Sequence, residues 1–371
     1  MEIAVVGGGL VGSSLLRRLA EAGHSVVCFG PETGQAPFSS HDDSGRITRI
    51  LDPSGIWATL AARSIAGYAG IEARSGVRFH HPVGVLWSAR STVSLRALEA
   101  VRRAFDVSTG EGLGGWEGIL AVEGDASLLE RGAAGYIEPR EMVRAHRRLA
   151  ASAGAVFDPG AVAAVEPVRG RWRIRLVGGG ETSADRTVIA AGAGSHRLVD
   201  VQMAVTGEVV IDARISDVDG ERLAGLPCIG RFDADGSRVE GYLTPPIRDD
   251  RGWSIKFGSE TDSPVLAGAE DVADWMRGDA HAERRPAMEA ALHSLLPRVE
   301  FGPIRSRPCI YARTPSGLPI IDEVAPGLVV ASGGNGRMAK SADAVAALAA
   351  DLVTESTWTD RELPRATFAS Q

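Results

Sequence analysis

The first thirty residues alternate between apolar and glycine-rich stretches in an order that predicts a β-α-β unit. Residues 3–6 are apolar and mostly β-branched, which is typical of a buried strand. A glycine-rich stretch, residues 7–12, follows this run, and leucines then recur at helical spacing up to residue 19. Residues 25–29 form a second apolar run of strand length. The pattern therefore predicts strand, helix and strand within one short segment.

Three glycines between the first strand and the helix have the spacing Gly-x-Gly-x-x-Gly. In such a motif Gly7 allows a tight turn, Gly9 lets a pyrophosphate approach the backbone, and Gly12 lets helix and strand pack closely. The start of the helix adds free N–H groups and the positive end of the helix dipole. The motif is weak in isolation, but its position between a strand and a helix favours a dinucleotide-binding site over an ordinary glycine-rich loop.

The end of the second strand departs from the usual pattern of such sites. An acidic residue normally stands there and holds the ribose of the dinucleotide. This chain has Gly30 at that position and places Glu32 two residues later. Either Glu32 binds the ribose or that contact is lost.

Several later segments also have apolar residues at spacings that predict helices or strands. Residues 138–150 carry an apolar stripe at helical spacing, with Pro139 near the start, and predict a helix. Residues 172–182 alternate apolar and charged positions around a glycine turn and predict a hairpin. Strand and loop patterns dominate from about 200 to 300, and the Ala-rich residues 342–354 predict a closing helix.

A second glycine-rich strand end lies far from the first. The apolar strand predicted for residues 185–190 runs into the sequence Ala-Gly-Ala-Gly at positions 191–194. Taken alone, this segment fits an ordinary buried strand followed by a glycine turn. Together with the N-terminal motif it is characteristic of flavin-binding folds, in which Gly192 would lie beside the cofactor.

Composition describes an ordinary globular protein. The 371 residues are 44% hydrophobic and 23% charged, and the formal net charge of −7 disfavours nucleic acid as the main partner. The chain is long enough to bury a large core and to divide into two lobes. Its three cysteines form no Cys-x-x-Cys pair, which suits a reducing cytoplasm. Glu2 and the glycines argue against a signal peptide, and no run has the length of a membrane helix, so we expect a cytoplasmic protein without a membrane partner.

Four segments carry a resemblance to a known family; they are residues 3–12, 39–49, 185–196 and 307–340. Together they resemble the flavin-dependent amine oxidases of the D-amino-acid-oxidase superfamily. The nearest branch is that of monomeric sarcosine oxidase, N-methyltryptophan oxidase and pipecolate oxidase. The resemblance implies a mixed α/β fold, in which a Rossmann-type FAD-binding domain carries an inserted substrate domain built on an antiparallel sheet.

The resemblance also implies domain boundaries. We expect the FAD-binding domain to be discontinuous and to consist of residues 1–79, 136–200 and 301–371. The substrate-binding domain would then consist of residues 80–135 and 201–300.

The segment that begins at Arg307 is the most specific part of the resemblance. Cys309 occupies the place where the sarcosine oxidase branch carries a cysteine bonded to the 8α-methyl group of the flavin. A thiolate is a strong nucleophile, and we expect Arg307 to favour it. The alternative is that Cys309 merely fills space in the core, as we expect of Cys28 and Cys228.

Residues 39–49 resemble the loop that passes over the flavin ring. The resemblance implies that Ser39, Ser40 and Arg46 lie at the cofactor, while Arg49 holds the substrate carboxylate. A guanidinium can bind a carboxylate through two parallel hydrogen bonds, which fixes its orientation as well as its charge. The alternative is a pair of surface arginines on a polar loop.

Residues 332–340 resemble the family's glycine-rich flavin loop. The resemblance implies that backbone N–H groups near Gly333 and Gly336 bind the flavin. It also makes Lys340 a second ligand of the substrate carboxylate. The alternative for Lys340 is an ordinary surface lysine in the first turn of a helix.

Tyr242 and Lys256 match two further family positions. Strand alternation places Lys256 on the face opposite Ile255 and Phe257. In the family such a lysine faces the flavin and activates oxygen, because a fixed positive charge stabilises superoxide. The alternative is a lysine on the outer face of a strand.

Two positions depart from the family. Asp42 and Glu260 stand where relatives carry histidines near the flavin or the substrate, and His41 is one position away. Our hypothesis is that Asp42 and Glu260 offset an extra positive group on the substrate.

These expectations lead to one main reaction and several alternatives. We expect an FAD-dependent oxidase that converts the C–N bond of a secondary or cyclic amino acid to an imine and reduces O2 to H2O2. The alternatives are a primary-amine oxidase of the glycine or D-amino-acid type, an FAD dehydrogenase with another electron acceptor, and a flavin- or nicotinamide-binding regulatory protein without turnover. We expect no metal site, since His80 and His81 precede a proline at a strand entry.

Overall fold

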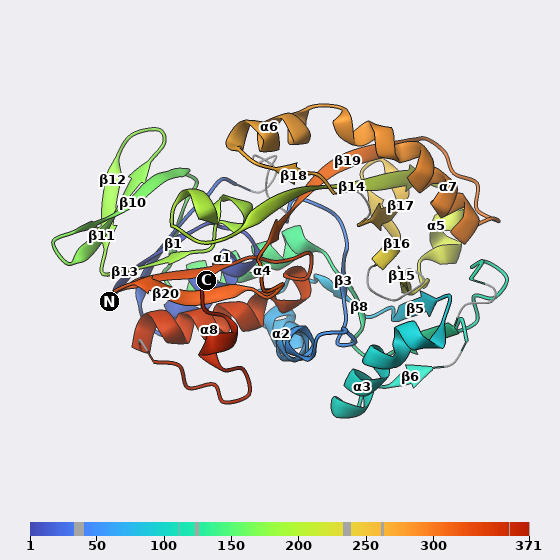
Figure 1. The fold of residues 1–371 in the computed structure, drawn as a ribbon, viewed down its shortest axis with the longest axis horizontal. Helices are drawn as coiled ribbons and strands as arrows, with labels where there is room; N and C mark the ends of the chain where they lie inside the picture. The colour runs from blue at the N-terminus through green and yellow to red at the C-terminus, as the bar shows by residue number, and fades with distance from the viewer. Residues whose placement is uncertain are drawn as a thin grey trace.

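The computed structural model describes residues 1–32, 41–110, 112–122, 126–232, 239–260, 263–355 and 357–370. Within these residues the strands form two large sheets and two small ones. The two ends and the centre of the sequence meet in one half of the molecule, and residues 85–130 and 204–313 form the other half (Figure 1).

The first large sheet combines strands that are far apart in the sequence. Its order is β20-β21-β13-β1-β2-β9, and all neighbours are parallel except β20 and β21. The strands are β1 (Glu2–Val6), β2 (Ser25–Phe29), β9 (Val156–Asp158), β13 (Arg186–Ile189), β20 (Ile320–Ala325) and β21 (Leu328–Ser332). The predicted β-α-β unit is confirmed, because α1 (Leu10–Glu21) connects β1 to β2 in parallel.

The two faces of this sheet are covered differently. Ile3 and Val5 of β1 pack into a core with the helices, whereas Ala4 and Val6 pack against the other face. This division follows from the alternation of side chains along a strand. The helices on the first face are α1, α2 (Gly55–Ser75), α4 (Pro139–Ser152) and α8 (Ala342–Glu355). A three-stranded sheet of β10 (Val162–Val168), β11 (Arg171–Leu176) and β12 (Glu181–Ala184) lies against the second face.

The second large sheet is mostly antiparallel. Its order is β18-β14-β17-β16-β15-β5-β7-β6, and β19 pairs with β14 along ten residue positions. Helices α6 and α7 pack on it from above in Figure 1. The elements of this half are β5 (Val85–Ala89), α3 (Arg96–Ala104), β6 (Thr109–Gly110), β7 (Ala126–Glu130), β14 (Ala204–Arg214), α5 (Asp217–Leu223), β15 (Cys228–Phe232), β16 (Val239–Asp249), β17 (Gly252–Ser259), β18 (Val265–Leu266), α6 (Ala269–Arg277), α7 (Arg285–Leu295) and β19 (Ile304–Arg313).

Short elements complete the fold. A small sheet has the order β3-β8-β4. Its strands are β3 (Arg46–Thr48), β4 (His80–His81) and β8 (Gly135–Ile137), and the 3-10 helices are η1 (Thr92–Leu95), η2 (Gly192–Arg197), η3 (Ala280–Arg284), η4 (Ala339–Ser341) and η5 (Arg365–Thr367). Among the described residues, no helix combines the length and the apolar character needed to cross a membrane.

The observed elements agree with the mixed α/β fold expected from the sequence. The predicted helices of residues 138–150 and 342–354 are α4 and α8, and the predicted hairpin is β11–β12. The sequence pattern did not predict α2, α6 or α7. The two-domain division stays a prediction, and one strand bears on it: β19 falls within residues 301–371 but pairs with β14 of the second sheet.

Candidate active site

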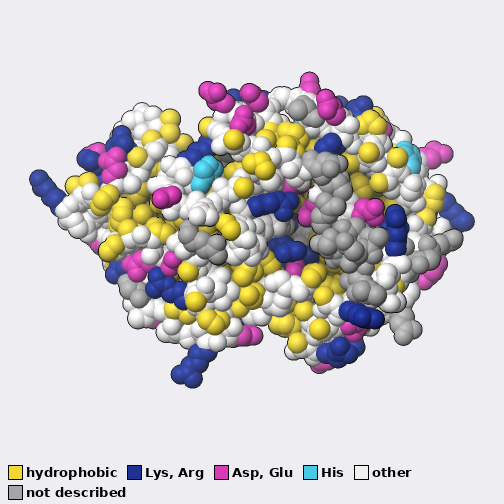
Figure 2. Space-filling model, viewed as in Figure 1, with side chains coloured by type: hydrophobic (Ala, Val, Ile, Leu, Met, Phe, Trp, Pro, Cys, Tyr) yellow, Lys and Arg dark blue, Asp and Glu magenta, His cyan; other side chains and the backbone are white. Residues whose placement is uncertain are grey.

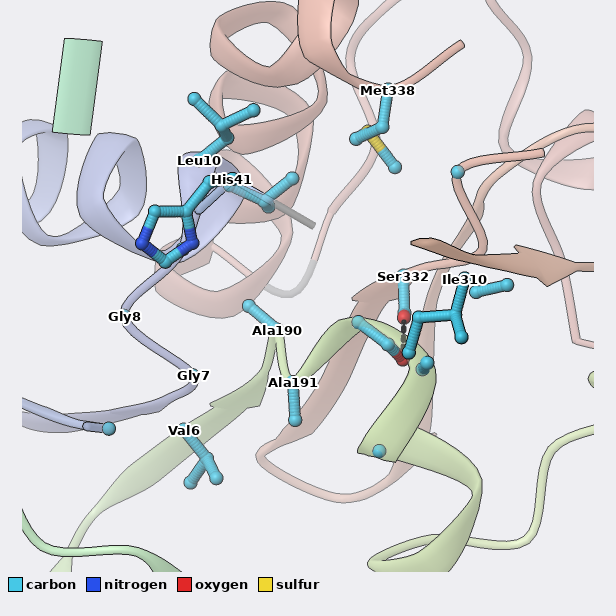
Figure 3. Close-up of a pocket in the computed structure, with 18 of the residues that line it drawn as sticks. Val6, Gly7, Gly8, Leu10, His41, Ala190, Ala191, Ile310, Ser332 and Met338 are labelled. Atoms are coloured by element: carbon cyan, nitrogen blue, oxygen red, sulfur yellow. Dashed lines mark hydrogen bonds between the residues drawn. The ribbon is translucent and has the colours of Figure 1, made fainter. Parts of the chain in front are cut away.

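A cavity of about 570 Å³ opens where the carboxyl ends of β1, β13 and β21 meet the strand β19. Open parallel sheets bind ligands at this edge. Figure 3 shows Val6, Gly7 and Ala190 on one side of the cavity and Ile310, Ser332 and Met338 on another. The lining is dominated by glycines and small apolar side chains, which leaves backbone within reach of a ligand.

The first glycine loop has no room for larger side chains. Gly7 has a φ of +108°, and a Cβ atom there would lie 2.3 Å from the carbonyl oxygen of Ala190. A Cβ at Gly12 would lie 1.6 Å from the carbonyl oxygen of Gly7. Gly9 begins α1 and provides no side-chain cap, so N–H groups of the first turn stay available to a ligand. This arrangement suits a phosphate group.

The structure explains why the acidic residue is absent from the end of β2. A Cβ atom on Gly30 would lie only 2.7 Å from the backbone nitrogen of Gly8, so the two chain segments touch there. Glu32 instead makes a 2.9 Å ion pair with Arg147, which also donates to the carbonyl oxygen of Gly8 and lies over the ring of Phe157. Glu32 is therefore held at the rim of the cavity, and its contact with a ribose stays a prediction.

The second glycine loop closes the cavity opposite the first. Gly333 has a φ of +84°, and a Cβ there would lie 2.3 Å from the side chain of Thr314. A Cβ at Gly336 would lie 2.7 Å from the ring of Tyr311. The hydroxyl of Ser332 donates to the carbonyl oxygen of Gly192, which ties this loop to the end of β13. Both predicted glycine segments thus line one cavity.

Asn335 fixes the shape of the second loop. Its side-chain oxygen accepts from the Thr314 backbone N–H at 2.9 Å, and its side-chain nitrogen donates to the carbonyl oxygens of Gly333 and Leu318. These bonds leave the backbone of the loop ordered without filling the cavity. The glycine-lined cradle and the apolar lining fit a dinucleotide such as FAD.

Cys309 lies next to this cavity, in β19 beside the lining residue Ile310. Its Sγ is 3.7 Å from Nη2 of Arg46, and its side chain is buried. The sequence predicts Arg307 as the neighbouring cation, but the guanidinium of Arg307 binds Asp43 and Asp212 instead. Arg46 is the cation in direct contact with the sulfur, and it reaches Cys309 from the start of β3, far away in the sequence.

Asp43 is the centre of a buried ionic cluster. Its carboxylate lies 3.0 Å from Lys256, 3.1 Å from Arg46 and 2.6 Å from Arg307. Burial by itself would raise the pKa of Asp43, but these three cations hold that pKa well below its usual range. Asp43 is consequently ionised and ties the loop before β3 to β17 and β19.

Lys256 has its ammonium group fully engaged. It donates to Asp43 and to the backbone carbonyl oxygens of Ser44 and Gly45, and an ammonium group has three protons. Burial lowers the pKa of Lys256 to about 8, against the opposing influence of Asp43. The predicted alternation holds, since Ile255 and Phe257 pack in the core of the second sheet while Lys256 faces this loop.

A second buried ionic cluster surrounds Asp52, just before α2. Lys340 donates to Oδ2 of Asp52 at 2.7 Å, and Arg49 and Arg337 approach the same oxygen at 3.4 and 3.5 Å. Burial, followed by the charge of Arg49, lowers the pKa of Lys340 to about 7. The structure therefore brings Arg49 and Lys340 together, as the resemblance implies, but around a carboxylate that belongs to the protein.

Tyr242 lies near the first cluster, whereas Glu260 lies near Arg49 and Arg337 of the second. The half-buried ring of Tyr242 packs across Gly258, and its desolvation raises the pKa of its hydroxyl. Burial and the negative charge of Glu208 raise the pKa of Glu260, while Arg313, Arg337 and Arg49 oppose that rise. Glu260 forms no ion pair with another described residue.

The other residues predicted for the site differ in whether they line the cavity. Asp42 makes a 2.6 Å ion pair with Arg140 and is not among the residues that line the cavity. His41 does line it, close to Gly9, and burial lowers the pKa of His41 to about 4. Ser39 and Ser40 lie outside the described residues. In the described part of the chain, no cluster of three or more His, Cys, Asp or Glu is placed to hold a metal ion.

Sequence patterns did not reveal the two carboxylates that organise the site, Asp43 and Asp52, or one cation, Arg337. The only available signal was that each stands within a few residues of a predicted cation. Sequence spacing cannot show that these acids point inward, because the partners Lys256, Arg307 and Lys340 come from distant elements.

Comparison with known proteins agrees with this geometry. Residues 2–352 match the model of the DAO family, described as FAD dependent oxidoreductases. The chain belongs to this family and is an FAD-dependent oxidoreductase. No curated protein sequence matches it significantly.

Solved structures with the same fold have low sequence identity to the chain. NikD, described as an unusual amino acid oxidase, has a TM-score of 0.80 at 19% identity, over 100% of this chain and 97% of its own. An iminodiacetate oxidase from Chelativorans sp. BNC1 has a TM-score of 0.74 at 17% identity, over 99% and 98%. L-proline dehydrogenase from P. horikoshii has a TM-score of 0.76 at 18% identity, over 99% and 96%. These likenesses show the fold.

Proposed function

We propose that the protein oxidises the C–N bond of a secondary or cyclic amino acid to an imine and passes the electrons to O2, which yields H2O2. One observation carries the proposal: Arg49, Arg337 and Lys340 gather next to the glycine loop that lines the cofactor cavity. Cations gathered beside a flavin site suit a substrate with a carboxylate. The relatives described as acting on amino acids, iminodiacetate and proline support this substrate class.

The protein's own groups position the substrate. Arginine binds the substrate carboxylate in a fixed orientation, which places the amine and its neighbouring C–H bond towards the cavity. The half-buried carboxyl group of Glu260 supplies a counter-charge for the substrate nitrogen and accepts its proton, which leaves the neutral amine that is oxidised. Asp42 is engaged with Arg140, so we assign the counter-charge to Glu260.

FAD held in this cavity would supply the two-electron redox chemistry that links oxidation of the amine to reduction of the acceptor. The first glycine loop would hold its phosphates, and the loop of Gly333 and Gly336 would hold the flavin end. The ammonium of Lys256, fixed by Asp43, keeps a positive charge near Arg46. Such a charge stabilises superoxide during electron transfer to oxygen.

We further propose that the sulfur of Cys309 is bonded to the 8α-methyl carbon of the flavin. The S–H and one methyl C–H bond would be broken, and the two electrons released would pass through the flavin to O2, which would yield H2O2. The contact between Arg46 and the sulfur supports this proposal, since a cation next to a thiol favours the reactive thiolate. Acid precipitation of the purified protein tests it. Yellow colour that stays in the protein pellet is the expected result, and colour released into the supernatant would show that the cofactor is not covalently held.

A panel of amines tests the reaction. N-methylglycine, proline, pipecolate and iminodiacetate are mixed with the protein without oxygen, and loss of the yellow flavin absorbance identifies substrates. The proposal predicts that at least one secondary amino acid bleaches the flavin and that air restores it with one H2O2 per turnover. A regulatory protein without turnover would not be bleached by any amine.

The same panel distinguishes this oxidase from a primary-amine oxidase and from a dehydrogenase. A primary-amine oxidase would prefer glycine or D-alanine to their N-methyl derivatives. A dehydrogenase would be bleached by a secondary amine but recover its colour only with an artificial acceptor. The likeness to L-proline dehydrogenase is the observation that favours testing for a dehydrogenase.

We also propose small molecules and O2, rather than nucleic acid or a membrane, as the partners in the cytoplasm. The three cysteines are free, and the face shown in Figure 2 intersperses acidic and basic side chains instead of presenting one broad basic surface. Nucleic-acid binding surfaces are strongly basic.

A further inference from the structure

Arg49 and Arg337 converge on one buried carboxylate but leave their hydrogen-bonding groups unused. Their nearest nitrogens lie 3.4 and 3.5 Å from Oδ2 of Asp52, which is longer than the roughly 2.7–2.9 Å of a charge-assisted hydrogen bond. Neither guanidinium donates a hydrogen bond to any other residue that the structure describes. The Nε of Arg49 is buried and has no partner there. A buried donor of this kind calls for a ligand.

Lys340, unlike these two arginines, is fully paired with Asp52. It makes a 2.7 Å hydrogen bond with Oδ2 of Asp52, and its side chain is 1% exposed while that of Asp52 is 0% exposed. The other oxygen of Asp52 accepts from the backbone N–H of Ser54 at 3.1 Å. The charge of Lys340 is thus already balanced inside the protein.

Arg337 has the accessibility that Lys340 lacks. Its side chain is 37% exposed, and the residues on either side of it, Gly336 and Met338, line the cofactor cavity. Figure 3 labels Met338. An arginine at this position can reach a ligand that lies next to the flavin end of the cavity. Lys340 lies behind it, against the start of α2.

Arg49 is held in place on two sides. Its guanidinium lies over the ring of Trp87, 4.7 Å from the centroid. The backbone after it is fixed by Glu130, whose carboxylate accepts from the N–H groups of Ile50 and Leu51 at 2.7 and 3.1 Å. A pre-positioned guanidinium loses little conformational freedom when it binds a carboxylate.

We propose that Arg337 and Arg49 together bind the substrate carboxylate, and that Lys340 is a positioning residue whose ammonium neutralises Asp52. This inference rests on the proposed function and corrects the expectation that Lys340 itself binds the carboxylate. Two neighbouring guanidinium groups share the single charge of Asp52. Burial, and then the charge of Arg337, lowers the pKa of Arg49. A carboxylate on the substrate supplies the second negative charge and fills the unused donors.

A matched pair of ligands that cannot be oxidised tests the inference on the holoenzyme. The probes are 2-furoate and 2-furamide, which differ only in the carboxylate, and binding is followed by the change in flavin absorbance and by thermal shift. Arg337→Gln is expected to weaken 2-furoate about 10- to 100-fold, the value of one charge-assisted pair, and to leave 2-furamide unchanged. Arg337→Lys should recover only part of the affinity, because a lysine keeps the charge but lacks the fork of donors.

A double variant shows whether Lys340 binds the substrate carboxylate or only neutralises Asp52. Asp52→Asn with Lys340→Met removes one negative and one positive charge together, so the net charge around Arg49 and Arg337 does not change. The inference predicts that this variant binds 2-furoate within about threefold of the wild type. A loss of tenfold or more in the double variant, with normal binding in Arg337→Gln, would overturn the inference and return Lys340 to the substrate.

The inference and the proposed function fail in different ways. Absence of flavin bleaching by every amine, with 2-furoate binding that still depends on Arg337, would refute the reaction and keep the anion site. Bleaching by a secondary amine, with 2-furoate binding that is absent or insensitive to Arg337, would refute the anion site and keep the reaction.

Discussion

The ammonium nitrogen of Lys256 lies 3.0 Å from Oδ2 of Asp43, and both side chains are buried. These residues are far apart in the sequence, yet the pair joins the loop before β3 to the middle of β17. Because Lys256 also donates to two backbone carbonyl oxygens, its charge cannot move away from the site. We therefore regard Lys256 as a fixed positive charge rather than a mobile proton donor.

Replacement of Lys256 by Met is expected to slow the reaction of the reduced protein with oxygen. Removal of one preorganised charge at a developing negative charge costs about 10²- to 10³-fold in rate. Flavin reduction by substrate should change much less, and stopped-flow absorbance measures the two half-reactions separately. Equal losses in both half-reactions would contradict this role.

The same charge predicts a pH dependence. Since the pKa of Lys256 is lowered to about 8, the rate of reoxidation should fall as pH rises through that value and the ammonium loses its proton. The fall should be absent in Lys256→Met. A pH profile that is identical in the variant would assign the dependence to another group.

Cys309→Ser is expected to abolish covalent retention of the flavin while the protein still folds. The serine hydroxyl is a poor nucleophile at neutral pH, whereas the cysteine sulfur lies beside Arg46. Cys228→Ser is the matched control, because Cys228 is also buried but contacts the carbonyl oxygen of Gly135. Acid precipitation should release the flavin only from the first variant, and release from neither would exclude Cys309 as the attachment point.

Gly12→Ala is expected to prevent cofactor binding. The added Cβ would lie 1.6 Å from the carbonyl oxygen of Gly7, so the turn and the start of α1 would have to separate. Gly70→Ala is the control, since no atom lies within 4 Å of a Cβ at that helical position and alanine favours a helix by about 1 kcal/mol over glycine. Flavin content per protein and thermal unfolding measure both effects. Full flavin content in Gly12→Ala would be the contrary result.

His146 should make the protein less stable in acid. It is fully buried and its Nδ1 accepts from Nε of Arg17 at 3.0 Å, and burial lowers its pKa to about 3. In the unfolded chain His146 therefore becomes protonated near pH 6.5, whereas in the folded protein it stays neutral until the pH approaches 3. The stability from this residue is complete above pH 6.5 and is lost as pH falls towards 3, with about 2 kcal/mol gone at pH 5.

Comparison with a variant isolates this contribution. His146→Gln cannot titrate, so its free energy of unfolding should fall less than that of the wild type between pH 8 and pH 5. Urea unfolding at the two values of pH gives the difference. Parallel losses in both proteins would show that other groups govern the acid response.

Local patterns predicted the elements that carry strong sequence signals. The boundaries expected for β2, α4 and α8 were correct within two residues, because their apolar positions repeat with a clear period. Helix α2 was missed although it is 21 residues long. It lies against helices α4 and α8 and buries polar residues such as Ser64 as well as apolar ones. Its sequence therefore lacks the regular alternation of apolar and polar positions that predicts a helix.

The residues of the candidate site were predictable only in part. The glycine segments and the cations near them are contiguous motifs, and the fold brings them to one cavity. The partners of those cations were not predictable. Asp43 and Asp52 are short acidic side chains on a loop, and only the packing of β17, β19 and η4 against that loop reveals which cations they bind.

The amino-acid sequence was enough to assign the FAD-dependent oxidoreductase fold, because the two glycine-rich strand ends and the segment that begins at Arg307 are contiguous motifs. How the charges are paired became visible only in the folded chain. An ion pair depends on distance and burial, and residues such as Asp52 and Lys340, almost three hundred positions apart, meet only when the chain has folded. That pairing leaves the guanidinium groups of Arg49 and Arg337, and not the ammonium of Lys340, with donors to offer a ligand.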